Sequence, residues 1–423
     1  MKILLSAYAC EPHKGSEPGV GWRWATELAR LGHEVWVITR GNNEPPIAGA
    51  LECDPMPNLH FVYYDLPQWL GWWKKGGRGV RLYYFLWQMG IYFVARRLNE
   101  AVGFNLVHHI TFVGVRQPSF MGLLGVPFVF GPAAGGEHAP RRLRKSFPLK
   151  ARITEWLRDV ANRITGFNPL MHLTFHTAAE ILVTSEETRQ LIPERYRHKC
   201  HVGLAIGVDL PRQVPERSGP GSRRIVFVGR LLYWKGVHLA LNAVARLIEN
   251  GLPTRFTVIG EGPDQDRLQA LARELGIADC VEWVPWISQK RLLRAYSEYD
   301  LMLFPSLHDS GGMVVLEAMA RGLPVVCLDL GGPGTIVNNT CGRVVVTRNR
   351  SEKEVIADLA GAVKTLLQND RALAGCSAVA PLRARKFSWT RVVGQIYGGI
   401  VGTAAGTVSG HGQPAGGKMQ QLR

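Results

Sequence analysis

Residues 305–324 read Pro-Ser-Leu-His-Asp-Ser-Gly-Gly-Met-Val-Val-Leu-Glu-Ala-Met-Ala-Arg-Gly-Leu-Pro, and short apolar runs lie on both sides. The runs at 301–304 and 324–328 have the length and apolar character of buried strands, and we expect a helix at 314–320 between them. A strand, a helix and a second strand in this order predict a parallel sheet. Ligands bind such sheets at the carboxyl ends of the strands, which is where Asp309 lies.

The same alternation of apolar runs and amphipathic segments extends outward from this stretch. Further strands are expected at residues 3–8, 34–39, 106–110, 128–130, 181–184, 225–228 and 255–259, and further helices at 19–31, 237–249 and 266–275. This order predicts an α/β fold made of two doubly wound Rossmann-like domains that face a cleft.

The composition changes at three places and predicts the domain boundaries. Three prolines and two glycines without apolar periodicity mark residues 211–221 as a linker. We therefore expect one Rossmann-like domain at 1–211 and a second at 225–385. An amphipathic helix at 386–401 is expected to pack back on the first domain, and the Gly-, Ala-, Ser- and Gln-rich residues 402–423 are expected to be a disordered tail.

The chain has 423 residues and a formal net charge of +16. This excess suits nucleic acid, an anionic membrane surface or a phosphorylated substrate, unless the cations are dispersed and only aid solubility. No recognised nucleic-acid-binding module is present, so a nucleic-acid partner is not expected.

The seven cysteines form no Cys-x-x-Cys pair, which argues against a disulfide framework and against a zinc site. We expect reduced cysteines in a cytoplasmic protein, and no metal or other cofactor. The sequence contains no apolar window of about 18 residues, so a transmembrane helix is not expected. The short apolar run after Met1 fits a buried strand better than a signal peptide.

Three loops that follow strands of the second domain carry residues suited to a diphosphate and a sugar. The first turns at Gly229 and places Arg230 and Lys235 before a helix, so two cations and a helix start can bind a diphosphate. A solvated turn with incidental charges is the alternative. The second loop contains Gly260 and Gly262, which would let the backbone approach a flat ring or a ribose.

The third loop lies within the stretch at 305–324. Amides at the helix start would point toward an anion; they belong to Gly311, Gly312, Met313 and Val314. Glu317 lies one turn into the helix, where its carboxylate can accept hydrogen bonds from both ribose hydroxyls. Asp309 can reach the transferred sugar from the loop.

This arrangement resembles glycosyltransferase family 4, whose members have the GT-B fold. Members typically carry two glutamates eight positions apart, followed by an Ala-Met-Ala-like helix and Gly-x-Pro-Val-Val. Asp309 and Glu317 have this spacing, and Arg-Gly-Leu-Pro-Val-Val follows them. The resemblance covers nearly the whole chain and is strongest over residues 227–332. Asp309 departs from the usual glutamate, and its reach is one methylene shorter.

The resemblance also implies roles for two glycine-rich loops of the first domain. Gly15 and Gly19 lie in a loop similar to family loops that close over the donor diphosphate and the acceptor; a plain glycine turn is the alternative. The segment Gly-Pro-Ala-Ala-Gly-Gly-Glu-His resembles a loop of bacterial exopolysaccharide transferases. It would turn Glu137 and His138 toward the acceptor side of the cleft.

Family members often have a histidine near the donor sugar, at the end of the strand that here contains His108 and His109. Strand alternation sends these two side chains to opposite faces of the sheet, so at most one can reach the sugar. We favour His109, and we expect the catalytic residues to be Asp309, His109 and Glu317.

Residues 66–97 interleave aromatic rings with cations, and residues 141–152 add six cations. Rings beside cations suit a lipid interface with anionic headgroups. A core helix followed by a solvated basic loop is the alternative. We expect a protein that is peripheral on the inner face of the cytoplasmic membrane.

These features together predict a retaining glycosyltransferase. The donor would be a UDP- or GDP-sugar carrying mannose, glucose or galactose, and the acceptor a glycan or a polyprenyl-diphosphate-linked glycan of bacterial exopolysaccharide or cell-surface polysaccharide synthesis. The alternatives are a soluble-acceptor transferase of the sucrose-synthase or glycogen-synthase type, and a noncatalytic protein that binds nucleotide-sugars.

Overall fold

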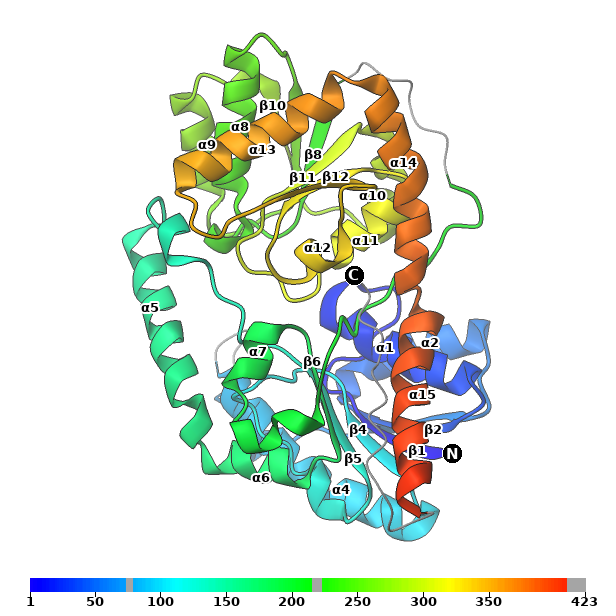
Figure 1. The fold of residues 1–423 in the computed structure, drawn as a ribbon. Helices are drawn as coiled ribbons and strands as arrows, with labels where there is room; N and C mark the ends of the chain where they lie inside the picture. The colour runs from blue at the N-terminus through cyan, green and yellow to red at the C-terminus, as the bar shows by residue number, and fades with distance from the viewer. Residues whose placement is uncertain (74–78, 215–222, 409–423) are drawn as a thin grey trace.

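The computed structural model describes residues 1–73, 79–214 and 223–408, and it shows two α/β domains, one above the other in Figure 1. Within these residues the first domain forms a seven-stranded sheet in the order β3-β2-β1-β4-β5-β6-β7. Every neighbouring pair is parallel. The strands are β1 Lys2–Ser6, β2 Glu34–Thr39, β3 Leu59–Tyr63, β4 Leu106–His109, β5 Phe128–Ala133, β6 Glu180–Val183 and β7 Cys200–Val202.

Helices cover both faces of this sheet, and the central strand β1 is therefore apolar and buried from Ile3 to Leu5. The helices are α1 Ser16–Arg30, α2 Glu44–Cys53, α3 Gln68–Gly71, α4 Val80–Val102, α5 Leu149–Ile164, α6 Pro169–Thr177 and α7 Glu186–Leu191. Alternate residues of β1 enter different cores: Leu4 packs with Tyr84 and Trp87, whereas Ile3 packs with Trp24.

The second domain has the same α/β architecture, with a six-stranded parallel sheet in the order β10-β9-β8-β11-β12-β13. Its strands are β8 Arg224–Val228, β9 Arg255–Ile259, β10 Val281–Val284, β11 Leu301–Phe304, β12 Val325–Leu328 and β13 Gly342–Val345. Its helices are α8 Val237–Glu249, α9 Gln265–Glu274, α10 Gln289–Ala295, α11 Met313–Ala320, α12 Gly331–Ile336, α13 Glu352–Leu367 and α14 Asp370–Ala384.

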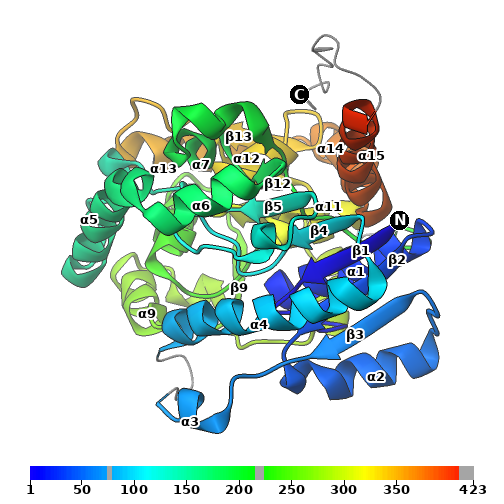
Figure 2. The same cartoon turned by 90° about the horizontal axis from the view of Figure 1, so that it is seen from below.

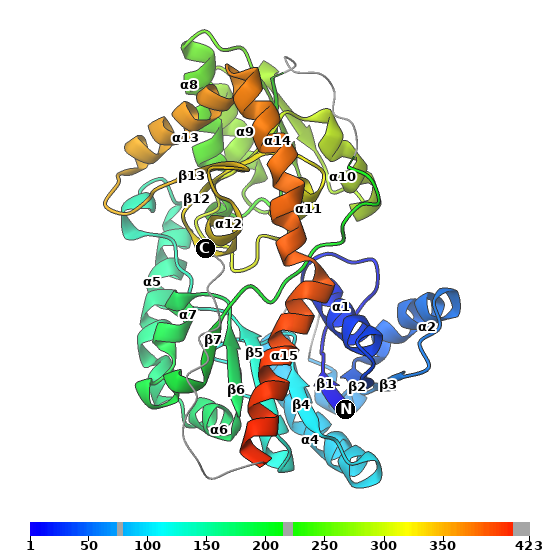
Figure 3. The same ribbon diagram turned by 45° about the vertical axis from the view of Figure 1, so that its right-hand side comes forward.

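The last helix, α15 Trp389–Val408, leaves the second domain and lies along the first (Figure 3). Trp389 and Tyr397 join the first domain's core, and Thr390 Oγ1 donates to Glu27 Oε2 at 2.8 Å. Residues 402–408, which were expected to belong to the disordered tail, instead continue the helix. These residues include two alanines and no proline, so the helix has no strong breaker there. Residues 409–423 lie outside the described residues.

The predicted fold of two doubly wound α/β domains is confirmed, with β9, β11 and α8 at the predicted bounds. The expected linker at 211–221 lies between β7 and β8, and its residues from 215 onward fall outside the described part. No helix among residues 1–73, 79–214 and 223–408 has the length and apolar character needed to cross a bilayer.

The two segments expected at a lipid interface are each divided between the core and the surface. Of the rings at 66–97, Tyr84 and Trp87 lie in the core, whereas Trp72 is exposed; Lys74, Lys75 and Arg78 lie outside the described residues. In the basic segment 141–152, Leu143 and Phe147 are buried in the core of the second domain. The chain leading into α5 therefore bridges the domains, and α5 runs along the outer edge of the molecule (Figures 1 and 2).

Candidate active site

A cavity of about 800 Å³ lies where the two domains meet. Helix α1 contributes Gly19 and Arg23 to its wall, α11 contributes Met313 and Glu317, and Trp389 lies at the start of α15. The other charged residues in the wall are Lys14, Asp209, Lys290, Arg294 and Arg321. Cations thus outnumber carboxylates by five to two, so the cavity suits an anionic ligand.

Glu317 is buried in the wall of this cavity. Gln289 Nε2, from the start of α10, donates to Glu317 Oε1 at 2.6 Å. Burial raises the pKa of Glu317 above its ordinary value, although the Gln289 bond and the charge of Arg321 oppose this. The protein thus fixes one carboxylate oxygen of Glu317, and the residue lies in the cavity wall. The sequence predicted a ribose-binding carboxylate at this residue, one turn into the helix.

Asp309 and Lys235 form an ion pair between two loops at the carboxyl edge of the second sheet, with Oδ2 and Nζ 2.5 Å apart. The other oxygen, Oδ1, accepts hydrogen bonds from the amides of Gly311 at 3.2 Å and Gly312 at 2.9 Å. Burial alone would raise the pKa of Asp309, but Lys235 and these amides lower it. Asp309 itself therefore neutralises the cation and the helix start that the sequence assigned to a ligand.

The remaining predicted donor residues lie on the loop after β8 and at the start of α11. Gly312, with a φ of +74°, begins α11, and a Cβ there would lie 3.1 Å from Pro333. Met313 and Val314 are partly buried in the first turn of the helix, and Arg230 is exposed on the loop after β8.

Gly260 and Gly262 have a different role from the one predicted. A Cβ on Gly260 would lie 2.1 Å from Gly229 O, and one on Gly262 would lie 2.3 Å from Leu231 O. Leu231 N also donates to Glu261 O at 2.9 Å. The two glycines let the loops after β8 and β9 approach each other, so the expected close contact is made with protein backbone rather than with a free surface.

Asp264 and Asp266 form the chain's single Asp-x-Asp triplet, a pattern that can bind a metal-diphosphate. Asp264 is buried at the start of α9, and both of its carboxylate oxygens accept from Arg267 at 2.7 Å. This carboxylate is therefore committed to an ion pair.

The glycine loop of the first domain contributes to the cavity through Lys14 and Gly19. Gly19 is buried, and a Cβ there would lie 2.1 Å from Lys14 O, so only glycine allows the loop to fold over the start of α1. Glu11 N donates to Pro18 O at 2.9 Å and closes the same loop. Gly15 is exposed at the N-cap of the helix.

His109 does not face the cavity. It is fully buried between β4 and α4, where its Nε2 lies 2.6 Å from Tyr84 Oη and 3.3 Å from Gln88 Nε2. Burial lowers the pKa of His109 to about 3, so the ring is neutral at pH 7. His108 points to the opposite face as predicted, but that face is covered by α15, and His108 Nδ1 lies 2.9 Å from Tyr397 Oη.

Glu137 also turns inward, contrary to the expectation that it faces the acceptor. Four protein donors surround its carboxylate at 2.7 to 3.1 Å: the amide of Gly135 and the hydroxyls of Thr184, Ser185 and Thr188. Burial opposes ionisation, but these hydrogen bonds lower the pKa of Glu137. Glu137 therefore fixes the glycine loop to β6 and α7.

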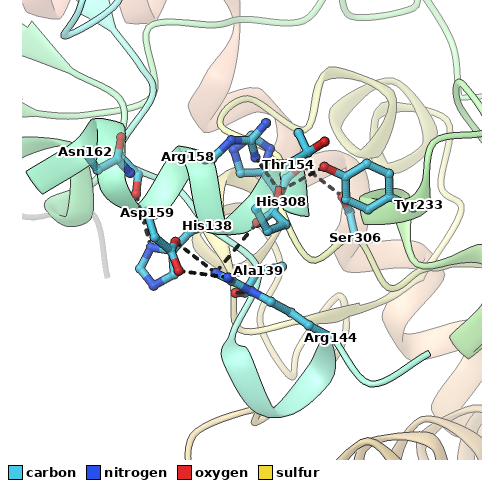
Figure 4. A network of polar contacts seen from close by, with 12 residues as sticks. His138, Ala139, Arg144, Thr154, Arg158, Asp159, Asn162, Tyr233, Ser306 and His308 are labelled. Carbon is cyan, nitrogen blue, oxygen red and sulfur yellow. Dashed lines mark hydrogen bonds and ion pairs between the residues drawn. The ribbon is translucent and has the colours of Figure 1, made fainter. Parts of the chain in front are cut away.

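His138 is exposed, and it lies beside a polar network between the domains (Figure 4). In this network Arg144 donates to both oxygens of Asp159, at 2.9 and 3.1 Å, and to Ala139 O at 2.7 Å. Figure 4 also shows Tyr233 and His308 of the second domain at its far side. His138 thus lies on the outer edge of the interface rather than in the cavity wall.

The same network reaches the donor loops through α5. Tyr233 Oη donates to Glu155 Oε1 at 3.1 Å, and Arg158 pairs with Glu155 at 3.0 Å. The Arg158 guanidinium lies 5.7 Å from the centre of the Trp234 ring. Tyr233 and Trp234 directly precede Lys235, so α5 contacts the segment that holds the site cation.

Sequence reasoning missed Gln289 and Arg321, which flank Glu317, as well as Glu155. Gln289 lies at the start of α10, a helix that was not predicted. Arg321 directly follows α11, and nothing in its own segment indicates that its charge lies beside Glu317. Glu155 is a single acid in an amphipathic helix, and nothing in its own segment indicates a partner on Tyr233.

Residues 213–380 match the family model of the glycosyl transferases, group 1. This span holds every donor residue predicted in the second domain. The group 1 pattern covers the whole second sheet and ends within α14.

Curated relatives match about half of the chain. A D-inositol 3-phosphate glycosyltransferase of Rhodococcus erythropolis is 37% identical over 203 residues, which are 44% of this chain and 45% of that protein. The chain therefore matches about half the length of the curated relatives it resembles.

Solved structures are similar over nearly the entire chain, at low identity. Sucrose-phosphate synthase from Thermosynechococcus elongatus has a TM-score of 0.63 at 18% identity, over 96% of this chain and all of the other. Anabaena HepE, in complex with UDP and glucose, has a TM-score of 0.58 at 16% identity, over 95% and 99% of the two chains. These likenesses establish the GT-B arrangement of the two domains.

Proposed function

We propose that this protein is a retaining glycosyltransferase that moves a hexose from a UDP- or GDP-sugar to a glycan or lipid-linked acceptor at the inner face of the cytoplasmic membrane. The observation that carries the proposal is Glu317, held by Gln289 in the wall of the interdomain cavity. The group 1 glycosyl transferase pattern over residues 213–380 supports it. The UDP and glucose bound by the similar HepE structure agree with this donor class.

In this proposal Glu317 accepts hydrogen bonds from the ribose hydroxyls, and Gln289 keeps it aimed at the cavity. The diphosphate binds Lys235, Arg230 and the first amides of α11, which offer a cation, a guanidinium fork and a helix start. Asp309 has to release Lys235 and these amides as the diphosphate arrives. Its carboxylate is then free to accept a hydrogen bond from the sugar.

The bond between the anomeric carbon and the phosphate oxygen breaks through an oxocarbenium-like state, and its electron pair leaves with the nucleoside diphosphate. Lys235, Arg230 and the helix amides stabilise the growing negative charge. Because His109 is buried outside the cavity wall, we propose that the acceptor oxygen bonds to the anomeric carbon and passes its proton to the leaving phosphate. Retention of configuration follows from the family resemblance and belongs to the proposal.

The acceptor carries a phosphate in our proposal. Lys14, Arg23, Lys290 and Arg294 line the cavity outside the donor residues. A lipid-linked diphosphate fits this charge, in the synthesis of bacterial exopolysaccharide or cell-surface polysaccharide. A soluble phosphorylated acceptor is the second candidate, because a relative that is 37% identical over 203 residues is named for D-inositol 3-phosphate.

The test is a panel of UDP- and GDP-sugars, with mannose, glucose and galactose on each nucleotide, scored by thermal shift and then by transfer. At a ligand concentration roughly 100 times its Kd, a true donor should raise Tm by about 5 °C. A flat response to all donors would refute the proposal. Binding without hydrolysis or transfer to any phosphorylated acceptor would identify a noncatalytic nucleotide-sugar-binding protein instead.

A further inference from the structure

Helix α5 has the reverse of the usual arrangement of a surface helix. Its polar residues Glu155, Arg158 and Asp159 face inward, where they bind Tyr233 and Arg144. Its apolar residues face outward, and they recur at the spacing of one helical face. The exposed apolar side chains, continuing into the turn after the helix, are Leu149, Ile153, Trp156, Leu157, Ile164 and Phe167.

The size of these side chains makes the exposure costly in water. Trp156 is 62% exposed and Phe167 is 82% exposed. In Figures 1, 2 and 3 the helix forms an edge of the molecule, with no described element outside it. A contiguous apolar stripe of this kind marks a contact with a partner or a membrane.

Cations flank the stripe on both sides. Lys150, Arg152 and Arg163 are exposed on the same helix. The helix's two carboxylates, Glu155 and Asp159, are paired on the inner face with Arg158 and Arg144. The outer face therefore presents apolar side chains between positive charges, with no negative charge of its own.

We propose that the outer face of α5 docks on an anionic lipid bilayer, with its apolar stripe at the level of the headgroups and its flanking cations on lipid phosphates. A bilayer supplies both features at once, an apolar layer and a sheet of negative charge. This inference rests on the proposed function and deepens it by naming the element that brings the enzyme to a lipid-linked acceptor. It moves docking away from residues 66–97 and extends the end of the basic segment 141–152 into the whole outer face of α5.

The test is flotation of the full chain with vesicles of phosphatidylcholine alone and of phosphatidylcholine with phosphatidylglycerol. The wild type should bind the anionic vesicles. Leu157→Glu should bind them at least roughly tenfold more weakly, because a charge replaces a side chain that enters the lipid. The matched control is Leu382→Glu on α14, since the two leucines are 54% and 57% exposed and both variants gain the same charge.

Unchanged binding by Leu157→Glu, or an equal loss in Leu382→Glu, would overturn the proposal. So would loss of binding in Trp72→Glu alone, which would return docking to residues 66–97. A dimer that becomes monomeric in Leu157→Glu without bilayer binding would identify a second copy as the occupant, and would also overturn it.

Thermal unfolding curves must show that each variant is folded. Trp156→Glu is a second substitution on the stripe. Donor binding is measured without vesicles, so the two proposals fail separately. A chain that binds UDP-sugars but no bilayer refutes only the docking face, and a chain that binds bilayers but no nucleotide-sugar refutes only the donor site.

Discussion

Two carboxylates of the second domain are held in opposite ways. Glu317 has one oxygen bound to Gln289, and it faces the cavity with a raised pKa. Asp309 has both oxygens occupied, by Lys235 and by two glycine amides, and its pKa is lowered. In the donor site that we propose, Glu317 is ready for a ligand, whereas Asp309 first has to exchange its protein partners for it.

Replacing Glu317 or Lys235 with alanine tests these roles. We expect each variant to lose at least roughly 100-fold in transfer rate, because each removes a group that binds the donor or its leaving diphosphate. Glu274→Ala, an exposed acid on α9, is the control and should keep the wild-type rate. Melting curves must show folded proteins, and near-wild-type rates in both site variants would contradict the assignment.

The raised pKa of Glu317 predicts a pH dependence for donor binding. Since burial raises this pKa above 4.5, Glu317 takes up a proton at a higher pH than an ordinary glutamate. Affinity for the nucleotide should fall as pH decreases through that raised pKa, because a protonated carboxyl accepts hydrogen bonds less well. Asp309 has a lowered pKa and stays ionised over this range.

Titration calorimetry with UDP or GDP at a series of pH values measures this effect. In Glu317→Gln the affinity should be weak and independent of pH in the same range. A pH profile of Glu317→Gln parallel to that of the wild type would assign the dependence to another group.

The sequence shows which residue types stand near the predicted cleft, but it did not predict the direction of their side chains. Alternation along β4 correctly separated His108 from His109. Both faces of the sheet are covered, however, so alternation could not expose either ring. Glu137 was recognised as an acid after glycines, yet three of its four donors lie in α7 or in the turn between β6 and α7, whose position depends on the folded sheet.

Helix α15 completes the first domain from the far end of the sequence. Its Tyr397 is buried against Trp24 and bound to His108. Tyr397→Ala should therefore lower the free energy of unfolding of the first domain by about 3–5 kcal/mol, through lost packing and an unpaired histidine.

Hydrogen exchange followed domain by domain would measure this change. Protection should fall in β1 and β4 and stay unchanged in β9. Gln395→Ala, an exposed position of the same helix, is the control. Equal loss of protection in both domains would show that α15 stabilises the whole molecule rather than the first domain.

The regular elements show which parts of the fold are encoded locally. Strands β9 and β11 were predicted at their observed bounds because a short apolar run between turns is visible in a few residues. Helix α4 was interpreted as a lipid-facing segment, since composition alone does not reveal that Tyr84 and Trp87 point inward while Phe93 points outward. Helix α5 was not predicted, although its apolar residues recur at the spacing of one helical face.

The two domains share more than a linker. Phe147 belongs to the first domain by sequence but lies in the core of the second, with ring centres 4.9 Å from Tyr233 and 5.9 Å from His238. Together with α5 this contact ties the edge of the first domain to the segment that precedes Lys235.

Phe147→Ala should uncouple the domains. We expect a loss of about 3–5 kcal/mol in the free energy of unfolding of the second domain, from the cavity left in its core. Differential scanning calorimetry should show a second-domain transition moved to lower temperature and separated from that of the first. Phe93→Ala, which removes an exposed ring from α4, should leave the trace unchanged. A single transition at an unchanged temperature in Phe147→Ala would contradict the coupling.

The return of α15 to the first domain also has a consequence for the order of events during synthesis. A ribosome makes residues 1–203 first, and domains generally begin to fold in that order. The groove that receives Trp389 and Tyr397 stays open until the second domain has been translated in full. The nascent first domain therefore carries an uncovered apolar groove beside Trp24, and it reaches its final stability only when the last helix emerges.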